Sequence, residues 1–249
     1  MSGEPILEAR NLRRSFGKVQ AVQDVSFTVE RGQVVGFIGA NGAGKTTTLR
    51  LLATLDAPDA GSIRAFGYDA LNYPDQVRAR LGWMPDQFGT YDNVTVAEYL
   101  DFYARAYGYH GATRARHVEE IMAFTELTSI QDRLMHTLSK GMGQRLCLGR
   151  SLINNPDLLL LDEPAAGLTA PDIRDLIAII RKVRNHGITL VLIEHHMDVV
   201  MNVCDTVSVL DFGQKIAEGK PAEIQANEKV IEAYLGGQAD EGAERLMGT

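Results

Sequence analysis

Hydrophobic and polar positions alternate near the start of the chain in a way that predicts β-strands. Residues 5–16 and 21–32 alternate apolar and polar side chains, and residues 33–39 form a short apolar run that ends in glycine. Alternation with a period of two is typical of half-buried strands, whereas an unbroken apolar run predicts a buried strand. Residues 61–69 read as a further strand between turns. We therefore predict a hairpin-rich edge that leads into a buried strand.

The apolar spacing becomes helical between about residues 87 and 155. Three segments, 95–108, 112–127 and 142–155, carry apolar residues three and four positions apart. This spacing places the apolar side chains on one face of an α-helix. The stretch therefore predicts a helical subdomain.

Strand and helix patterns alternate again beyond residue 156. A helix is expected earlier in the chain, at 45–55. Beyond residue 156 we expect strands at 157–162 and 188–194, helices at 170–187, 196–204 and 221–237, and a hairpin at 205–219. Such alternation indicates an α/β fold whose central strands are parallel. The polar segment 238–249 is expected to be loose.

Composition narrows the class of protein. The chain has 249 residues, of which 45% are hydrophobic, so it can bury a substantial core. Its net charge of −7 argues against a nucleic-acid partner, because binding phosphate backbones needs clustered Lys and Arg. The two cysteines, Cys147 and Cys204, are expected to be buried thiols rather than a disulfide. Since no apolar run reaches the roughly 18 residues of a membrane span, we expect a soluble chain that reaches a membrane only through a partner.

The segment "GANGAGKTT", residues 39–47, satisfies the pattern G-x-x-x-x-G-K-[ST] between a predicted strand and a predicted helix. Glycines let consecutive backbone N–H groups point into one concavity, and the following helix adds a positive dipole, so phosphates can bind there. An accidental lysine in a glycine-rich turn would not explain the flanking elements. We expect Lys45 to reach the β and γ phosphates of a nucleotide and the Thr46 hydroxyl to bind Mg²⁺. The residues expected to line this site are Gly39, Asn41, Gly42, Ala43, Gly44, Lys45, Thr46 and Thr47.

Two adjacent acids, Asp162 and Glu163, follow four leucines and precede Pro164. In a P-loop protein the strand that carries the Mg²⁺-binding carboxylate ends near the phosphates, so we expect Asp162 to bind the metal. Glu163 can then act on the water that attacks the γ-phosphate. The alternative is a pair of solvated acids that open a loop, and the upstream P-loop favours the catalytic reading.

Two further motifs separate this chain from other P-loop proteins. The segment "TLSKGMGQR" at 137–145 comes shortly before the Asp162 strand, and "IEHH" ends the next strand. Together they resemble the nucleotide-binding subunits of ATP-binding cassette (ABC) transporters, whose signature reads LSGGQ and whose switch histidine ends the strand after the acids. The resemblance covers about residues 6–235.

The resemblance implies an α/β fold with a P-loop NTPase (RecA-like) core and parallel central sheet, an N-terminal antiparallel β-subdomain and an inserted helical subdomain. It implies ATP and Mg²⁺ as cofactors, and a second nucleotide-binding subunit and integral membrane permease subunits as partners. The chain would then lie at the cytoplasmic face of a membrane. We expect four regions: a β-subdomain with the P-loop half of the core, a helical subdomain, the second half of the core, and a C-terminal helix with its tail. Their expected ranges are 1–86, 87–156, 157–220 and 221–249.

The family pattern assigns roles to single residues. Ser139 and Gly141 match the signature, which contacts the γ-phosphate of ATP on the partner subunit in a head-to-tail dimer. His195 matches the switch histidine at the γ-phosphate. The pair His195–His196 also raises the alternative of metal ligation, but adjacent side chains point in different directions. Phe16 matches the aromatic that stacks on adenine, and a place in the core is its alternative.

Several positions depart from the family pattern. Lys140 and Met142 replace a glycine and the glutamine of LSGGQ. Where the family has a glutamine that senses Mg²⁺ and water, Asp86 stands, and Gln87 follows. We hypothesise that Asp86 fills this role as a metal-binding anion, while a shift of one residue would bring in Gln87. Thr169 replaces the aspartate of the family's D-loop, which questions the usual cross-dimer contact.

The chain combines two resemblances. Residues 6–161 are most similar to ATPases of ABC-2-type exporters, and residues 162–236 to ATPases of branched-chain amino acid importers. A natural mosaic, a recombinant and a designed sequence all fit this combination. Because the helical subdomain couples to the membrane partner in this family, we favour export, with branched-chain amino acid import as the alternative.

Three other classes share part of these motifs. A small-molecule kinase would use the P-loop but would not explain "LSKGMGQR" or His195. A non-transport ABC ATPase would need a long coiled-coil insertion or a second cassette. An ATP-binding scaffold without turnover is disfavoured because Lys45, Thr46, Asp162 and Glu163 are all present.

Overall fold

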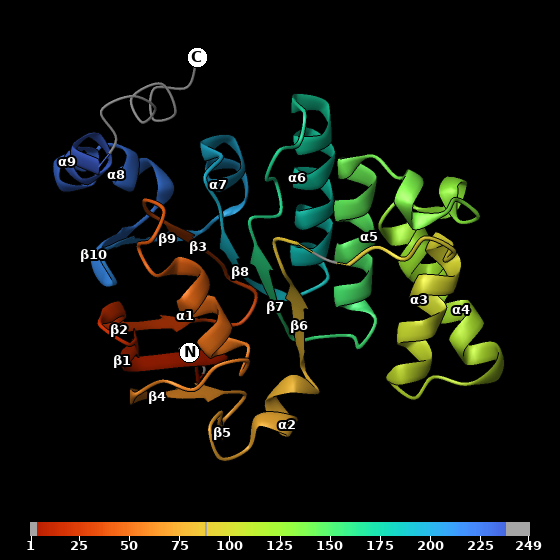
Figure 1. Ribbon diagram of the computed structural model, residues 1–249, viewed down its shortest axis with the longest axis horizontal. Helices are drawn as coiled ribbons and strands as arrows, with labels where there is room; N and C mark the ends of the chain where they lie inside the picture. Colours follow the sequence, from red (N-terminus) through yellow and green to blue (C-terminus); the bar gives the residue numbers. More distant parts are fainter. Residues whose placement is uncertain (1–3, 88, 238–249) are drawn as a thin grey trace.

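The computed structural model describes residues 4–87 and 89–237, which form two β-sheets and the helices around them (Figure 1). The larger sheet has six strands in the order β10-β9-β3-β8-β7-β6. Neighbours from β9 to β6 pair in parallel, and β10 joins antiparallel at one edge. The predicted parallel central sheet is therefore confirmed. Its strands are β3 (Val34–Ile38), β6 (Leu81–Met84), β7 (Leu158–Asp162), β8 (Thr189–Ile193), β9 (Thr206–Asp211) and β10 (Gln214–Gly219).

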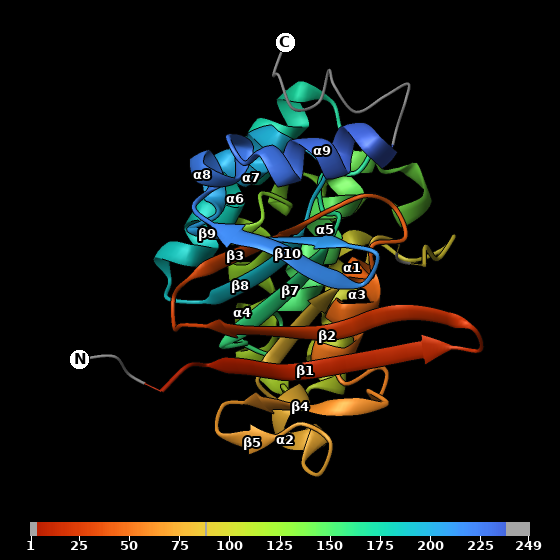
Figure 2. The same cartoon turned by 90° about the vertical axis from the view of Figure 1, so that its left-hand side faces the viewer.

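The smaller sheet is antiparallel and has the order β2-β1-β4-β5. Figure 2 shows it running alongside the larger sheet, with β2 nearest to it. The two sheets share a core in which the rings of Phe27 and Phe37 lie edge to face, with centroids 4.9 Å apart. The N-terminal antiparallel sheet is as predicted. Its strands are β1 (Leu7–Phe16), β2 (Val19–Val29), β4 (Ala60–Ala65) and β5 (Tyr68–Asp69).

Strand β7 is buried on both faces, which explains its run of leucines. Leu158 and Leu160 pack into the core on the side of the smaller sheet, whereas Leu159 and Leu161 pack against the helices on the other side. All four side chains are inaccessible to solvent. A strand buried in this way has no solvent face, so the alternation expected of a half-buried strand is absent.

Three helices form the inserted helical part, α2 lies beside β5 and β6, and the others lie around the larger sheet (Figure 1). Thr95 begins α3 with a capping box, in which its hydroxyl accepts from the backbone N–H of Glu98 while the Glu98 side chain accepts from the backbone N–H of Thr95. The inserted helices are α3 (Val96–Ala106), α4 (Gly111–Phe124) and α5 (Lys140–Leu152). The others are α1 (Lys45–Leu52), α2 (Pro74–Arg78), α6 (Ala170–Asn185), α7 (Met197–Val203), α8 (Pro221–Gln225) and α9 (Glu228–Gly237).

The structure differs from the sequence-based expectation in several elements. The single strand expected at 61–69 is two strands, β4 and β5, that pair across a turn. Strand β6 and helix α2 were not predicted, because each spans only four or five residues and shows no clear period. The single C-terminal helix expected at 221–237 is in fact two, α8 and α9. Asn227 separates them, since its side chain accepts from the backbone N–H of Lys229 and caps the second helix. The segment 238–249 lies outside the described residues.

Both cysteines are free thiols in apolar surroundings. Burial raises the pKa of Cys147 to about 11 and that of Cys204 to about 12, so neither is a thiolate near neutral pH. In the ranges that the structure covers, no helix is long and apolar enough to cross a membrane.

Candidate functional site

The loop between β3 and α1 has the geometry that the G-x-x-x-x-G-K-[ST] pattern predicts. Gly44 precedes the first residue of α1 with φ of 93°, a left-handed conformation that glycine adopts without strain. A Cβ atom at this position would lie 2.1 Å from the backbone oxygen of Ala21 in β2, so no other residue fits. Asn41 and Gly42 are exposed at the tip of the loop. The chain therefore offers an open backbone turn at the N-terminus of α1, as phosphate binding requires.

Lys45 is folded back into this loop. Its ammonium nitrogen Nζ donates to the backbone oxygens of Gly39 at 2.9 Å and of Ala40 at 3.0 Å. Burial lowers the pKa of Lys45, and the negative charges of Glu163 and Asp162 oppose that shift. The cation is thus held at the phosphate loop next to two acids, where it can bind an anionic ligand.

Asp162 ends β7 and meets the first turn of α1. The Thr46 hydroxyl donates to its Oδ1 at 3.2 Å, so residues 116 positions apart form one contact. Burial, together with the nearby charge of Asp86, raises the pKa of Asp162 to about 6. Among residues 4–87 and 89–237, no group of three or more His, Cys, Asp or Glu could hold a metal ion. The hydroxyl and the carboxylate fit Mg²⁺, which is commonly held by one or two carboxylates together with phosphate oxygens.

Glu163 and His195 lie together at the ends of β7 and β8. Glu163 Oε1 is 2.9 Å from His195 Nε2, and both side chains remain partly exposed. Glu163 has φ of 48°, a conformation that is uncommon for a residue with a side chain. Its backbone N–H donates to the oxygen of Ile193 at 3.1 Å, which continues the pairing of the two strands. A carboxylate and an imidazole are thereby held in contact beside the phosphate loop.

Asp86 and Gln87 follow β6, and both side chains are exposed. The negative charge of Asp86 contributes to the raised pKa of Asp162, so Asp86 faces the same site. This interaction places a negative charge near Asp162, next to the proposed metal site.

Phe16 ends β1 with its ring 48% exposed. The guanidinium of Arg14 lies over the ring, 4.7 Å from its centroid. The alternative of a core position is therefore wrong, and the ring is accessible for stacking.

The signature segment begins α5. Ser139 is the N-cap, and its hydroxyl accepts from the backbone N–H of Met142 at 3.3 Å. Gly141 is buried, and a Cβ there would lie 2.4 Å from Asp172 Oδ1 at the start of α6. Figure 1 draws α5 and α1 on opposite sides of β7 and β6. The helix that follows Ser139 is therefore separated from the P-loop helix of its own chain by these strands.

Thr169 has a structural role that the sequence comparison did not suggest. It is the N-cap of α6, where its hydroxyl donates to Asp172 Oδ2 at 2.6 Å and accepts from the backbone N–H of Asp172. Such a cap satisfies backbone groups at the start of the helix. Thr169 thus orders the segment that connects Glu163 to α6.

Sequence reasoning missed Glu194, the residue before His195. Its side chain is 1% exposed. Oε1 accepts from the backbone N–H of Ala165 at 2.7 Å, and Oε2 accepts from those of His195 at 3.0 Å and His196 at 3.1 Å. Burial raises the pKa of Glu194 to about 7, although these three hydrogen bonds lower it. The signal was present in "TLVLIE", where an acid follows an apolar strand just as Asp162 does.

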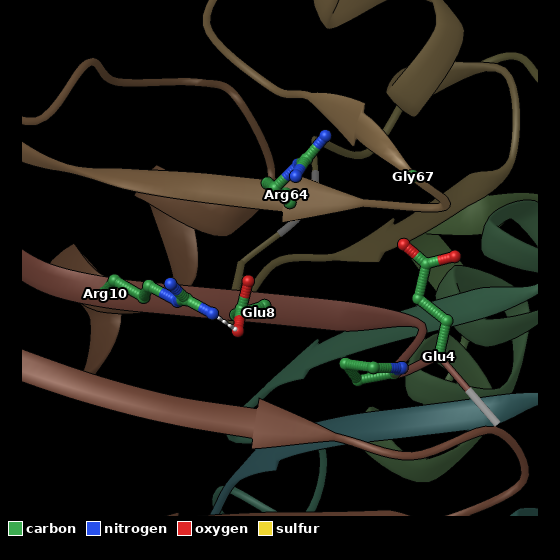
Figure 3. A pocket seen from close by; sticks show the side chains of 6 residues that line it. Glu4, Glu8, Arg10, Arg64 and Gly67 are labelled. Carbon is green, nitrogen blue, oxygen red and sulfur yellow. Dashed lines mark hydrogen bonds and ion pairs between the residues drawn. The ribbon is translucent and has the colours of Figure 1, made fainter. Parts of the chain in front are cut away.

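A surface pocket lies on the smaller sheet, and none of its residues belongs to the predicted site (Figure 3). Its charges have both signs, and Glu8 pairs with Arg10 at 2.6 Å. The pocket lacks the backbone cradle that makes the P-loop suited to phosphates. Its lining residues are Glu4, Pro5, Glu8, Arg10, Arg64 and Gly67.

Comparison with known proteins agrees with this geometry. The family model described as ABC transporter matches residues 22–166, and the model described as Branched-chain amino acid ATP-binding cassette transporter matches residues 214–240. Nod factor export ATP-binding protein I of Ralstonia nicotianae is 40% identical over 235 residues, which cover 92% of this chain and 73% of that protein. Daunorubicin/doxorubicin resistance ATP-binding protein of Streptomyces peucetius is 34% identical over 97% of this chain and 74% of that protein.

Solved structures of ABC transporter cassettes are also similar to this chain. The ADP conformation of an ATP-binding cassette of an ABC transporter superposes with a TM-score of 0.82 at 28% identity, over 94% of this chain and 100% of that chain. The chain therefore belongs to the ABC transporter family, as an ATP-binding subunit that hydrolyses ATP to power transport.

Proposed function

We propose that this chain drives export through a separate ABC-2-type permease, and that Glu163 is its general base. The observation that carries the catalytic part is the 2.9 Å contact between Glu163 and His195, beside the contact between Thr46 and Asp162. A base must lie within hydrogen-bonding reach of the water that it activates, and it needs a partner that fixes its direction.

In the proposed mechanism the P-loop and Lys45 hold the phosphates, and Thr46, Asp162 and Asp86 hold Mg²⁺. When bound, Mg²⁺ neutralises charge that develops on the phosphate oxygens. The exposed ring of Phe16 stacks on adenine.

Glu163 takes a proton from water, whose oxygen then bonds to the γ-phosphorus as the bond to ADP breaks. His195 holds Glu163 in place through Nε2. These roles use positioning and charge, which supply most of the catalysis in phosphoryl transfer.

We propose that two such subunits form the complete ATPase. Ser139 and Gly141 begin a helix that lies away from the P-loop of its own chain, so a second nucleotide-binding subunit would supply them to the nucleotide. In a two-fold dimer each chain gives its signature to the other's P-loop, and two equivalent sites result. The dimer would lie at the cytoplasmic face of the membrane, attached to permease subunits.

Export is favoured because relatives named for Nod factor export and for daunorubicin/doxorubicin resistance align with more than nine-tenths of this chain. Branched-chain amino acid import is the second candidate, because the importer model matches residues 214–240. Co-purification with an ABC-2-type permease and with an importer permease pair would distinguish the two. A stable complex with the importer pair alone would contradict export.

The catalytic proposal is tested with Glu163→Gln. This variant should bind Mg·ATP with the affinity of the unchanged protein, while turnover falls by a factor of about 100 or more, as expected when a general base is lost. ATP binding by calorimetry and phosphate release in the steady state measure the two effects. Turnover equal to that of the unchanged protein would remove Glu163 from this role.

The role of Asp86 is tested by comparing two adjacent variants. Asp86→Ala should reduce ATPase activity and raise the Mg²⁺ concentration needed for half-maximal rate, because a metal-binding charge is lost. Gln87→Ala is the matched control and should have little effect. The opposite result, with activity lost only in Gln87→Ala, would assign the role to Gln87.

A further inference from the structure

Glu194 joins two loops that each contribute one member of the catalytic pair. The first loop follows β7 and contains Glu163 and Ala165, and the second follows β8 and contains His195 and His196. One oxygen of the Glu194 carboxylate accepts from the first loop, and the other oxygen accepts from the second. A single side chain therefore bridges the two loops, in addition to the hydrogen bond from the Glu163 N–H group to the oxygen of Ile193.

The first loop depends on this contact because of its local geometry. Glu163 has a left-handed backbone, Pro164 has no N–H group, and Ala165 is completely buried. Without Glu194, the N–H of Ala165 would be a buried donor that loses its acceptor, which is costly in a folded chain. Glu194 thus fixes the turn in which Glu163 adopts its unusual conformation.

The second loop depends on the same carboxylate. Consecutive N–H groups of His195 and His196 point at Oε2, so the direction of the chain after β8 is fixed by one acceptor. His195 Nε2 then lies 2.9 Å from Glu163 Oε1. Burying a carboxylate is unfavourable, and the fold retains it where the contacts to both loops converge.

We propose that Glu194 is a positioning residue, which sets the distance and direction between Glu163 and His195. This inference rests on the roles proposed above for Glu163 and His195. Glu194 acts through these two residues and does not touch the nucleotide.

The test replaces Glu194 by glutamine, which has the same shape. Glutamine has only one acceptor oxygen, and its NH₂ group would face the N–H donors of one loop. We expect kcat to fall by a factor of about 10 to 100, because small displacements of reacting groups have effects of this size. The KM for ATP and the affinity for ATP should change by less than about threefold, since the P-loop is untouched.

Thr189→Val is a matched control at the other end of β8. The Thr189 hydroxyl is buried and accepts from the backbone N–H of Gly32 at 2.9 Å, so this variant also loses a buried hydrogen bond. It should lower the melting temperature and leave kcat unchanged. An equal kcat in Glu194→Gln and Thr189→Val would overturn the inference, because Glu194 would then have only a structural role.

A second comparison uses His195→Ala and Glu163→Gln. If Glu194 acts through the pair, adding Glu194→Gln to His195→Ala should lower kcat by less than about twofold, because coupled residues are not additive. A full further loss in the double variant would overturn the inference. If neither His195→Ala nor Glu163→Gln lowered turnover, the proposed catalytic roles would fail first, and this inference with them.

Should Glu194→Gln not fold, Glu194→Asp provides the same comparison. Aspartate keeps two acceptor oxygens but is one methylene shorter, so it reaches only one of the loops. A fall in kcat without a change in KM would support the inference, and an unchanged kcat would overturn it.

Discussion

Single acids at the ends of two neighbouring strands define the site at the scale of residues. Asp162 ends β7 and Glu194 follows β8, and burial raises the pKa of the first to about 6 and of the second to about 7. Because the strands are parallel, their carboxyl ends meet at one edge of the sheet, where ligands of open α/β sheets bind. Burial disfavours the charged form of both carboxylates, and both acids nevertheless lie at the edge of the sheet where ATP hydrolysis is proposed.

The raised pKa of Glu194 predicts a pH dependence of stability. Its usual value is 4.5, and burial raises it to about 7, with the charge of Glu163 acting in the same direction. Between these values the folded state binds the proton more tightly than the unfolded chain. The free energy of unfolding should therefore fall by about 2 kcal/mol as the pH rises from 5 to 7.5.

Urea unfolding at several pH values, without nucleotide or Mg²⁺, measures this dependence. Asp162 contributes with the same sign at lower pH. The thiol of Cys204 and the carboxylate of Glu163 also lie near Glu194, and the ring of His195 contacts Glu163. Glu194→Gln should flatten the profile between pH 6 and 7. Parallel profiles for the two proteins would contradict the assignment.

Much of the candidate site can be predicted from sequence because its motifs are local. The spacing of the P-loop fixes Lys45 and Thr46, and an apolar run that ends in an acid identifies Asp162. The hydrogen bond from Ala165 to Glu194 joins residues 29 positions apart and depends on the register of β7 and β8. The acid after the apolar run is visible in "TLVLIE", but its contact with Ala165 has no local pattern, so the sequence does not predict that Glu194 joins the two loops.

At the scale of elements, α5 and α6 approach closely where Gly141 faces Asp172. A Cβ at Gly141 would lie 2.4 Å from a carboxylate oxygen that belongs to the first turn of α6. Asp172 cannot move freely, because it is paired with Thr169 in the helix cap. The signature glycine is thus required by packing within the chain, apart from any contact with a nucleotide.

Gly141→Ala should lower the free energy of unfolding by about 1 to 3 kcal/mol through overpacking at this contact. Denaturant unfolding measures the loss. Asp172→Ala is the control, and the double variant Gly141→Ala/Asp172→Ala should be more stable than Gly141→Ala. Strictly additive losses would show that the two positions do not interact.

The elements differ in how well sequence predicts them. Strands β7 and β8 have unbroken apolar runs, and α6 has a clear helical period, so these elements were predicted. Strand β6 contains Gly82, whose lack of a side chain lets the backbone oxygen of Ser151 in α5 approach. This close packing is a tertiary property, and four residues are too few to show a period.

At the scale of the whole molecule, the two halves of the proposed site lie in different parts of the chain. The P-loop follows β3, whereas Ser139 begins α5 on the other side of β7 (Figure 1). In the proposed dimer, each complete site would therefore take its P-loop from one chain and its signature from the other. A monomer should bind ATP through its P-loop but turn it over slowly.

Mixing two inactive variants tests this arrangement. Lys45→Ala removes the P-loop lysine, and Ser139→Arg blocks the signature. In an equal mixture about half of the dimers contain one chain of each kind, and each of these has one intact site out of two. About a quarter of the original activity should return if the sites act independently. ATPase activity no higher than the mean of the separate variants would contradict shared sites.

The strand order of the larger sheet has a consequence for synthesis on the ribosome. Strand β3, which leads into the P-loop, emerges early, but its neighbours are β8 (Thr189–Ile193) and β9 (Thr206–Asp211). β1 and β2 pair with each other across a short turn, so their hairpin can form on the nascent chain. The nucleotide site is therefore completed only after β9 has emerged, and ATP binding reports that the segment from β3 to β9 has been made and folded.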